Sequence, residues 1–325
     1  MARQNPGQQL DAIVDAILDG RGDKKLAALA SIAQDLRDLP RAGFKTHLRA
    51  DLERRAAMTT SAAGKAVNPI REGFHSITPY LIVPGAAQLI DFMKAAFGAE
   101  EHFRIKRPGG DVIMHAEVKI GDSMIELAEA NDQFPPTPAT IVLRVNDVDA
   151  VFNRAVEAGA TVMQPVADQE YGARSATVLD GSGNRWNIFR PTEGNVIFKD
   201  FRSVTPHFNP LRAPAMIEFL QKAFGAEEIY RAQHPDGTIP HAQVRIGDSI
   251  IGMGEAHGPY QPMPCTLHLY VPDVDAAYER ALQAGATSIQ PPADQPYGER
   301  SGGVTDPFGN RWFVATHIRD VAIPG

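Results

Sequence analysis

A sequence repeated within the chain constrains the fold more than any other feature. Residues 115–129 (HAEVKIGDSMIELAE) and 241–255 (HAQVRIGDSIIGMGE) are identical at nine of fifteen positions. Residues 155–186 and 281–312 are identical at twenty of thirty-two positions, at the same offset of 126. Similarity that extends over whole secondary-structure elements at one offset indicates a duplicated domain. The sequence therefore predicts two copies of one domain.

Each copy also repeats a smaller unit. The apolar run at residues 81–83 leads into a predicted helix that ends near Gly98, and the run at 143–145 leads into a similar helix. Asp147 and Asp273 occupy expected helix N-caps, where an aspartate side chain can accept a backbone N–H. Short β-rich runs separated by glycine turns follow each helix. The sequence thus predicts an α+β fold of four units, each with one strand, one helix and three strands.

The remaining residues suggest how the chain is organised. Residues 1–58 place apolar side chains at helical spacing and predict a helical head, and residues 59–72 are small and polar, as in a linker. The two copies follow at 73–193 and 194–325. A head this short buries little surface alone, so we expect it to pack on the rest of the chain or on a second subunit, giving a homodimer. The alternative is an adaptor for a partner protein.

Charge and composition exclude several classes of function. The formal net charge is −7 and there is no basic run, which argues against a nucleic-acid partner. Cys265 is the only cysteine, so no intramolecular disulfide can form, as expected in a reducing compartment. No apolar run is long enough to span a bilayer, and the first residues lack a signal-peptide pattern. We expect a cytoplasmic protein whose partner is a small molecule and not a membrane.

Five stretches of the chain resemble a known family. They are TPYLIV at 78–83, HAEVKIGDS at 115–123, LHLYVPDVDAAYERALQAGAT at 267–287, YGERSG at 297–302 and DPFGNRWFVATHI at 306–318. Together they resemble the vicinal oxygen chelate superfamily, in its glyoxalase/bleomycin-resistance branch. The resemblance implies that units pair so that their sheets curve around a cavity. It leaves the function open, because lyases, isomerases, dioxygenases and drug-binding proteins share this fold.

The resemblance also implies where a metal would bind. Metal-dependent members hold a divalent ion with His, Gln and Glu side chains from the first and last strands of each unit. Of the aligned positions, Glu126 alone is a good ligand for a hard or borderline cation. We therefore expect no ion at the inherited site, with zinc, nickel, manganese or iron as candidates if a site is remade. The aligned positions are Thr78, Glu126, Thr140, Asn187, Thr205, Gly252, Thr266 and Phe313.

Two histidines of the second copy are the main catalytic candidates. His207 and His268 each follow an aligned position by two residues, so each side chain faces the same way as that position. The first copy has Tyr80 and Val142 in their places. We expect both imidazoles to enter one cavity, in the second copy, as general acid and base or as remade metal ligands.

Other residues are predicted to surround this cavity. His241 and Glu255 are expected to assist catalysis, although equivalent residues in the first copy favour a structural role. Arg300 could clamp a carboxylate or phosphate, and the alternative is an ion pair with Asp306. The residues predicted to contact substrate are Tyr270, Arg300, Tyr297 and Phe313.

Two functions of different classes are consistent with these residues. The first is an enzyme, a lyase, isomerase or hydrolase, that acts on a small organic substrate in the cavity of the second copy. The alternative is a non-catalytic protein that binds a drug or metabolite, as bleomycin-resistance proteins do. The lost metal ligands favour binding, whereas the unequal histidines favour chemistry. An extradiol dioxygenase ranks lower, because no His-His-Glu iron triad stands at the expected positions.

Overall fold

The computed structural model describes residues 67–321. The helical head predicted at 1–58 and most of the linker predicted at 59–72 lie outside the described residues. From Val67 onward the chain forms one compact unit. The predicted order of one strand, one helix and three strands occurs four times in it, which confirms the predicted fold class.

The four units follow one another along the chain. Unit 1 contains β1 (Ile77–Val83), α4 (Ala86–Phe97), β2 (Glu100–Lys106), β3 (Ile113–Ile120) and β4 (Ser123–Glu129). Unit 2 contains β5 (Thr140–Arg144), α5 (Val148–Glu157), β6 (Thr161–Gln169), β7 (Ala173–Leu179) and β8 (Arg185–Pro191). Unit 3 contains β9 (Val204–Phe208), α6 (Ala213–Phe224), β10 (Glu227–Ala232), β11 (His241–Ile246) and β12 (Ser249–Met253). Unit 4 contains β13 (Thr266–Tyr270), α7 (Val274–Gln283), β14 (Thr287–Asp294), β15 (Glu299–Thr305) and β16 (Arg311–His317).

The helices begin and end where the sequence predicts. The Asp147 carboxylate accepts the N–H of Ala150, and the Asp273 carboxylate accepts the N–H of Ala276, both at 3.0 Å. Gly98 ends α4 with a φ of +68°, a left-handed conformation that glycine adopts without steric cost. Among the described helices, none is both long and apolar enough to cross a membrane.

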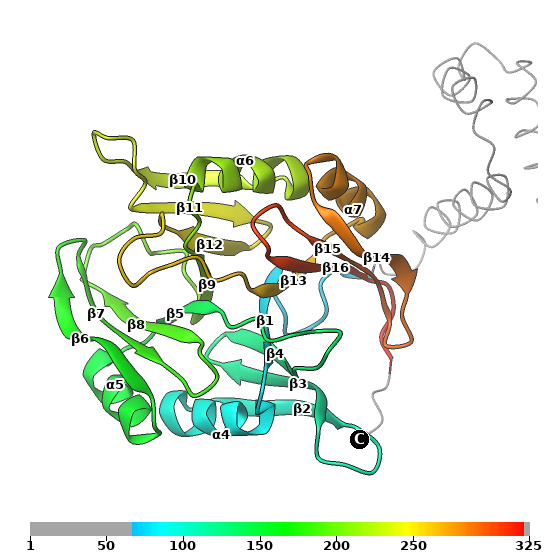
Figure 1. Cartoon of the computed structure of the whole chain (residues 1–325), viewed down its shortest axis with the longest axis horizontal. Coiled ribbons are helices and arrows are strands. Elements are labelled where there is room, and N and C mark those ends of the chain that lie inside the picture. Colours follow the sequence, from blue (N-terminus) through cyan, green and yellow to red (C-terminus); the bar gives the residue numbers. More distant parts are fainter. Residues whose placement is uncertain (1–66, 322–325) are drawn as a thin grey trace, which may run out of the picture. The chain divides into compact units, whose positions relative to one another are not determined.

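The units pair across the two copies and not within them (Figure 1). Sheet I joins unit 1 to unit 4 in the order β14-β15-β16-β13-β1-β4-β3-β2. Sheet II joins unit 2 to unit 3 in the order β10-β11-β12-β9-β5-β8-β7-β6. At each seam two first strands run antiparallel, β1 with β13 and β5 with β9. Each sheet therefore contains half of each copy.

Helix packing holds the two units of one copy together. Helix α4 packs against α5 and α6 packs against α7, as Figure 1 shows. Two equivalent hydrogen bonds cross these pairs, from Arg154 Nε to the Ala96 carbonyl and from Arg280 Nε to the Ala223 carbonyl, both at 3.2 Å. The main core, which includes the fully buried Trp186, fills the space between the helices and the sheets. The opposite face of each sheet is left to carry functional side chains.

The repeated Gly-Asp-Ser turns join the two sheets. In the turn at 247–249, Asp248 Oδ1 accepts the N–H of Ser76 at 2.8 Å, which fixes the start of β1. The turn at 121–123 makes the equivalent contacts with the start of β9. Gly247 has a φ of +58°, and a Cβ there would overlap the Ser76 hydroxyl. The repeated motif is therefore explained by structure, because it ties units from opposite sheets.

Replacing Asp248 with Ala is expected to lower the free energy of unfolding by about 1–3 kcal/mol, because the Ser76 N–H loses its acceptor. The carboxylate also contacts Arg202 Nη2 at 3.0 Å, and backbone and side-chain donors lower its pKa to about 2 despite partial burial. Urea unfolding measures the change. Asp236→Ala, in an exposed hairpin turn, is the control, and equal losses from both variants would contradict the linking role.

Candidate functional site

The strand register brings five positions together on sheet I. His268 lies opposite Thr78 across the seam and beside Phe313 on β16. On the other side of the seam, Tyr80 lies beside Glu126 of β4. Tyr80 therefore occupies the first-strand position next to the inherited glutamate, two residues beyond the predicted Thr78.

Glu126 and His268 form a buried ion pair across the seam. His268 Nδ1 lies 2.9 Å from Glu126 Oε2, and its Nε2 lies 3.6 Å from Glu299 Oε2. Burial by itself would lower the pKa of His268, but the charges of the two carboxylates outweigh burial and raise it to about 9. Burial would raise the pKa of Glu126, yet the charge and hydrogen bond of His268 lower it. The pair is therefore an imidazolium and a carboxylate at neutral pH.

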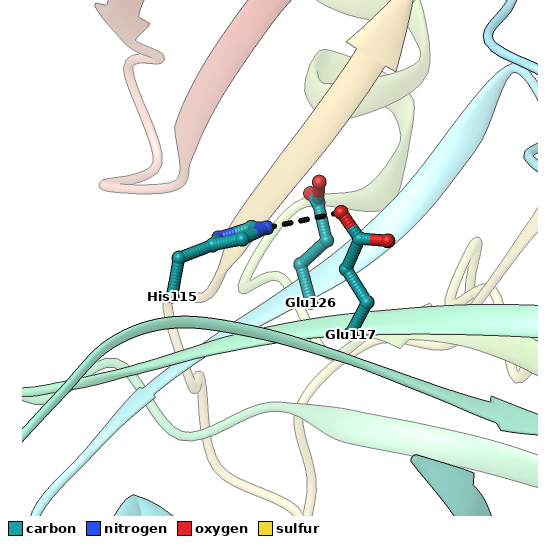
Figure 2. A group of neighbouring side chains, drawn as sticks. All are labelled: His115, Glu117 and Glu126. Atoms are coloured by element: carbon teal, nitrogen blue, oxygen red, sulfur yellow. Dashed lines mark hydrogen bonds and ion pairs between the residues drawn. The ribbon is translucent and has the colours of Figure 1, made fainter. Parts of the chain in front are cut away.

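Two residues of β3 extend this cluster. His115, Glu117 and Glu126 point toward one another, with one potential ligand atom from each lying within 4.8 Å of the others (Figure 2). His115 Nε2 lies 3.2 Å from Glu117 Oε1, and the Tyr80 hydroxyl lies 3.3 Å from His115 Nδ1. We call Glu117, Glu126, Glu299, His115 and His268 the acidic site.

The acidic site has its own positive charges. Arg71, from the segment before β1, donates to Glu117. Burial would raise the pKa of Glu117, but hydrogen bonds from His115 and Arg71 and the Arg71 charge lower it. Tyr270 donates its hydroxyl to Glu299, and its ring stacks on His268 with centroids 4.5 Å apart. Each buried carboxylate therefore has a proton donor or a cation beside it.

The donors of the acidic site fit a divalent cation. One imidazole and two carboxylates are ligands that zinc and similar ions accept, and they lie close enough to converge with small shifts. Phe313, at the fourth inherited position, offers no donor atom. His115, Glu117 and Glu126 would hold the ion. Only Glu126 of this set stands at an inherited position, because His115 and Glu117 come from β3, and the set includes neither His207 nor His268.

The equivalent face of sheet II has a different character. His207 lies beside Gly252 and opposite Thr140. The rings of His207 and His241 stack with centroids 6.3 Å apart. Burial, together with the charges of His241 and Arg185, lowers the pKa of His207 to about 3, and burial lowers that of His241 to about 4. Both imidazoles are therefore neutral near pH 7. We call His207, His241, Gln243 and Arg185 the histidine site.

The expectation that His207 and His268 enter one cavity is wrong. His207 lies on sheet II and His268 on sheet I, because β9 pairs with β5 while β13 pairs with β1. The alternation of side chains along each strand was assigned correctly, but the pairing of units across copies separates the two rings. His241 accompanies His207 on sheet II, so the predicted group of residues is divided between two sites.

Two further predicted site residues contact other parts of the fold. The Glu255 carboxylate accepts the N–H of Ala213, at the start of α6, and therefore caps a helix. Arg300 donates to Asp275 at 2.6 Å and to Asp294 at 2.9 Å. The alternative pairing of Arg300 with Asp306 is wrong, because Asp306 accepts the Trp312 indole N–H and the N–H groups of its own turn.

Three of the four predicted substrate contacts lie at or near the acidic site of sheet I. Tyr270 and Phe313 lie on sheet I beside His268, as the ring stacking and the strand register place them. Burial raises the pKa of the Tyr297 phenol, as do the charges of Glu299 and Glu126, which places this half-exposed side chain near the acidic site.

The acidic site contains residues that were not predicted from the sequence. The sequence offers His115 only as the first-copy equivalent of His241, and it does not predict Glu117, Glu299 or Arg71 as site residues. A signal was present in the differences between the copies. At an offset of 126, Glu117 becomes Gln, Glu126 becomes Gly, His268 replaces Val and Glu299 replaces Ala. At each of these four positions, one copy has an ionisable side chain and the other copy does not.

Comparison with known proteins agrees with this geometry. Residues 73–188 and 212–314 match the Glyoxalase/Bleomycin resistance protein/Dioxygenase superfamily. The chain belongs to this superfamily. The family membership predicted from the repeated motifs is thereby confirmed, and the matched residues include part of each of the four units.

Two relatives and one solved structure are similar to parts of this chain. A 130-residue segment is 39% identical to "Uncharacterized protein Rv0887c" of Mycobacterium tuberculosis, covering 37% of this chain and 76% of that protein. "Putative glyoxylase CFP32" of the same species is 25% identical over 218 residues, or 62% of this chain and 79% of that protein. Glyoxalase I from Zea mays superimposes with a TM-score of 0.58 at 14% identity, over 74% of this chain and 92% of that one. At that identity the similarity shows the fold alone.

Proposed function

We propose that this protein is a glyoxalase-type enzyme, a lyase or isomerase that moves protons on a small organic substrate at the acidic site. The observation that supports this is the buried pair of Glu126 and His268, 2.9 Å apart, on the sheet face away from the helices. Buried groups with opposing charges and shifted pKa values are typical of acid–base sites. Tyr80, His115 and Phe313 are partly exposed beside the pair and would contact the substrate.

The protonation states of the pair suit proton transfer next to a carbonyl. The Glu126 carboxylate would take a proton from the carbon beside the carbonyl, while the His268 imidazolium gives its proton to the carbonyl oxygen. The products are an enol, a neutral carboxyl and a neutral imidazole, so protons and charge balance. Returning a proton to the neighbouring carbon completes an isomerisation, and loss of a leaving group completes a lyase reaction.

A divalent cation would be held by His115, Glu117 and Glu126. When bound, such an ion supplies Lewis-acid polarisation of a substrate oxygen. Arg71 neutralises Glu117 in the structure, so Arg71 also sets how much negative charge the three ligands present to a cation. Elemental analysis of the purified protein measures whether one equivalent of a transition metal is bound.

The proposal predicts deuterium exchange into small carbonyl compounds. In D₂O, wild-type protein is expected to exchange the C–H next to the carbonyl of some members of a panel of small ketones, aldehydes and 2-oxo acids. His268→Gln removes the acid and should abolish this exchange. His102→Gln, an exposed histidine of β2 on the same sheet, is the control. Proton nuclear magnetic resonance follows the loss of the C–H signal.

The outcome also tests the site predicted from sequence. Equal exchange by wild type and His268→Gln would contradict the proposal, as would exchange lost in His207→Gln alone. A compound that binds tightly and is recovered without deuterium would instead support the second candidate, a non-catalytic binding protein. The observation that favours that candidate is that each buried carboxylate of the acidic site already has a cation or a hydroxyl donor beside it.

A further inference from the structure

The histidine site adjoins a small cavity in sheet II. Its volume is about 40 Å³, and one water needs roughly 10–15 Å³ on such a measure, so the space suits a few waters or one small polar group. Five residues from three strands, β5, β8 and β9, contribute to its wall, and the loop between β12 and β13 adds Tyr260. The lining residues are Thr140, Val142, Arg185, Asn187, His207, Asn209 and Tyr260.

Arg185 lies in the wall of this cavity and lacks a counter-charge among the described residues. Its side chain is buried, with the residue 4% exposed. It donates to Thr140 Oγ1 at 3.3 Å, to Asn209 Oδ1 at 3.1 Å and to the Pro259 carbonyl at 3.3 Å, all of which are neutral acceptors. The Tyr260 ring lies 5.1 Å below the guanidinium. Among residues 67–321 no carboxylate forms an ion pair with it.

A buried cation without a counter-charge is costly to a fold. Removing a guanidinium from water costs several kcal/mol, and neutral acceptors recover only part of that. Burial accordingly lowers the pKa of Arg185, although guanidinium remains charged in proteins. Such a group is expected where a bound anion completes the charge balance.

Two buried nitrogens around the cavity also lack partners in the described part of the chain. Arg185 Nε and His207 Nδ1 make no hydrogen bond within the described structure. Most buried polar atoms in proteins are paired, so an unpaired donor beside a cavity indicates an additional group that is not part of the chain. The neutral His207 ring can share a proton with such a group but cannot supply the missing negative charge.

The equivalent residue of the other sheet shows that this arrangement is particular to sheet II. Arg311 stands 126 residues after Arg185, is partly exposed and donates weakly to the Pro135 carbonyl at 3.4 Å. The site near it on sheet I contains three carboxylates, whereas the residues that line the sheet II cavity include none. The two faces have therefore diverged in the sign of charge that they would attract.

We propose that the sheet II cavity binds the carboxylate group of a small organic anion, with Arg185 as its counter-ion. A planar carboxylate can accept two parallel N–H groups of a guanidinium, which a spherical ion cannot do. The cavity volume restricts the buried part of the ligand to that group, and the rest of a larger molecule would extend past Tyr260. This binding site is independent of the proposed reaction on sheet I.

Acetate is the probe, and acetamide is its neutral counterpart of the same size. At constant ionic strength, acetate up to about 100 mM is expected to raise the melting temperature of wild-type protein, whereas acetamide and chloride do not. Arg185→Gln should weaken acetate binding at least tenfold, measured by calorimetry. Arg311→Gln is the matched control and should bind acetate as wild type does.

A second variant keeps the test decisive if Arg185→Gln folds poorly. Arg185→Lys retains the positive charge but not the two parallel N–H groups of the guanidinium. It should therefore bind acetate more weakly than wild type and more tightly than any folded neutral variant. The proposal would be overturned if acetamide stabilised wild type and Arg185→Lys as much as acetate does. So would a response to phosphate or sulfate with none to acetate, because it would assign the site to a different anion.

Discussion

Glu126→Gln is expected to lower the rate of carbonyl-linked proton exchange by about 10²–10⁴-fold, the contribution typical of a positioned acid or base. The amide keeps the size of the side chain but cannot take a proton from carbon. It also leaves His268, which is 7% exposed, with Glu299 as its remaining carboxylate. The exchange rate in D₂O on any compound accepted by wild type measures the effect.

The control for this change is Glu100→Gln, which alters an exposed carboxylate of β2 on the same sheet. Its exchange rate should equal that of wild type. Circular dichroism and the melting temperature establish that Glu126→Gln is folded before rates are compared. A folded Glu126→Gln protein that exchanges at the wild-type rate would remove Glu126 from the mechanism, and with it the proposed role of the buried pair.

The free energy of unfolding is expected to fall by on the order of 3 kcal/mol as pH rises from about 6.5 to above 9, an estimate from the His268 pKa shift. The folded protein holds the His268 proton up to a pKa of about 9, whereas an unfolded histidine releases it near 6.5. The stabilisation is therefore fully present below pH 6.5 and is lost as pH rises through 9. Urea unfolding at a series of pH values measures this.

His268→Gln supplies the comparison, because it removes the titrating group. Its stability should vary much less than that of wild type between pH 6.5 and 9. Below pH 6.5 both proteins should lose stability, since folding keeps His207 and His241 neutral, with pKa values of about 3 and 4. Identical alkaline slopes for wild type and His268→Gln would show that the buried ion pair does not hold its proton as proposed.

The predicted elements followed from local chemistry that the sequence displays directly. Asp147 caps α5 and Gly98 ends α4 because capping depends on a few neighbouring residues. The repeated Gly-Asp-Ser turns were recognised as turns, but their contacts with Ser76 and Ser203 join residues 172 and 81 positions apart. Such contacts have no local pattern.

The candidate site was predicted only in part for a related reason. His268, Tyr270, Phe313 and Glu126 were each selected, yet they were assigned to separate cavities. Comparing the copies at the first strands selected His207 and His268, whereas comparing charge at every strand position would have selected Glu117 and Glu299 as well. The pKa of His268 depends on carboxylates 142 and 31 residues away, so its charge state could not be deduced from its neighbours in sequence.

The sequence by itself determined the duplicated strand–helix–three-strand unit, its caps, its turns and the superfamily. Only the tertiary structure decided which units share a sheet. The side chains of all four first strands alternate in a similar way. The backbone groups of β1 that bond to β13 could equally well bond to β5 or β9. Pairing across the copies, together with helix packing within each copy, places three carboxylates on one sheet and, on the other, an arginine that no described carboxylate pairs. Charge on each face thus depends on which units meet.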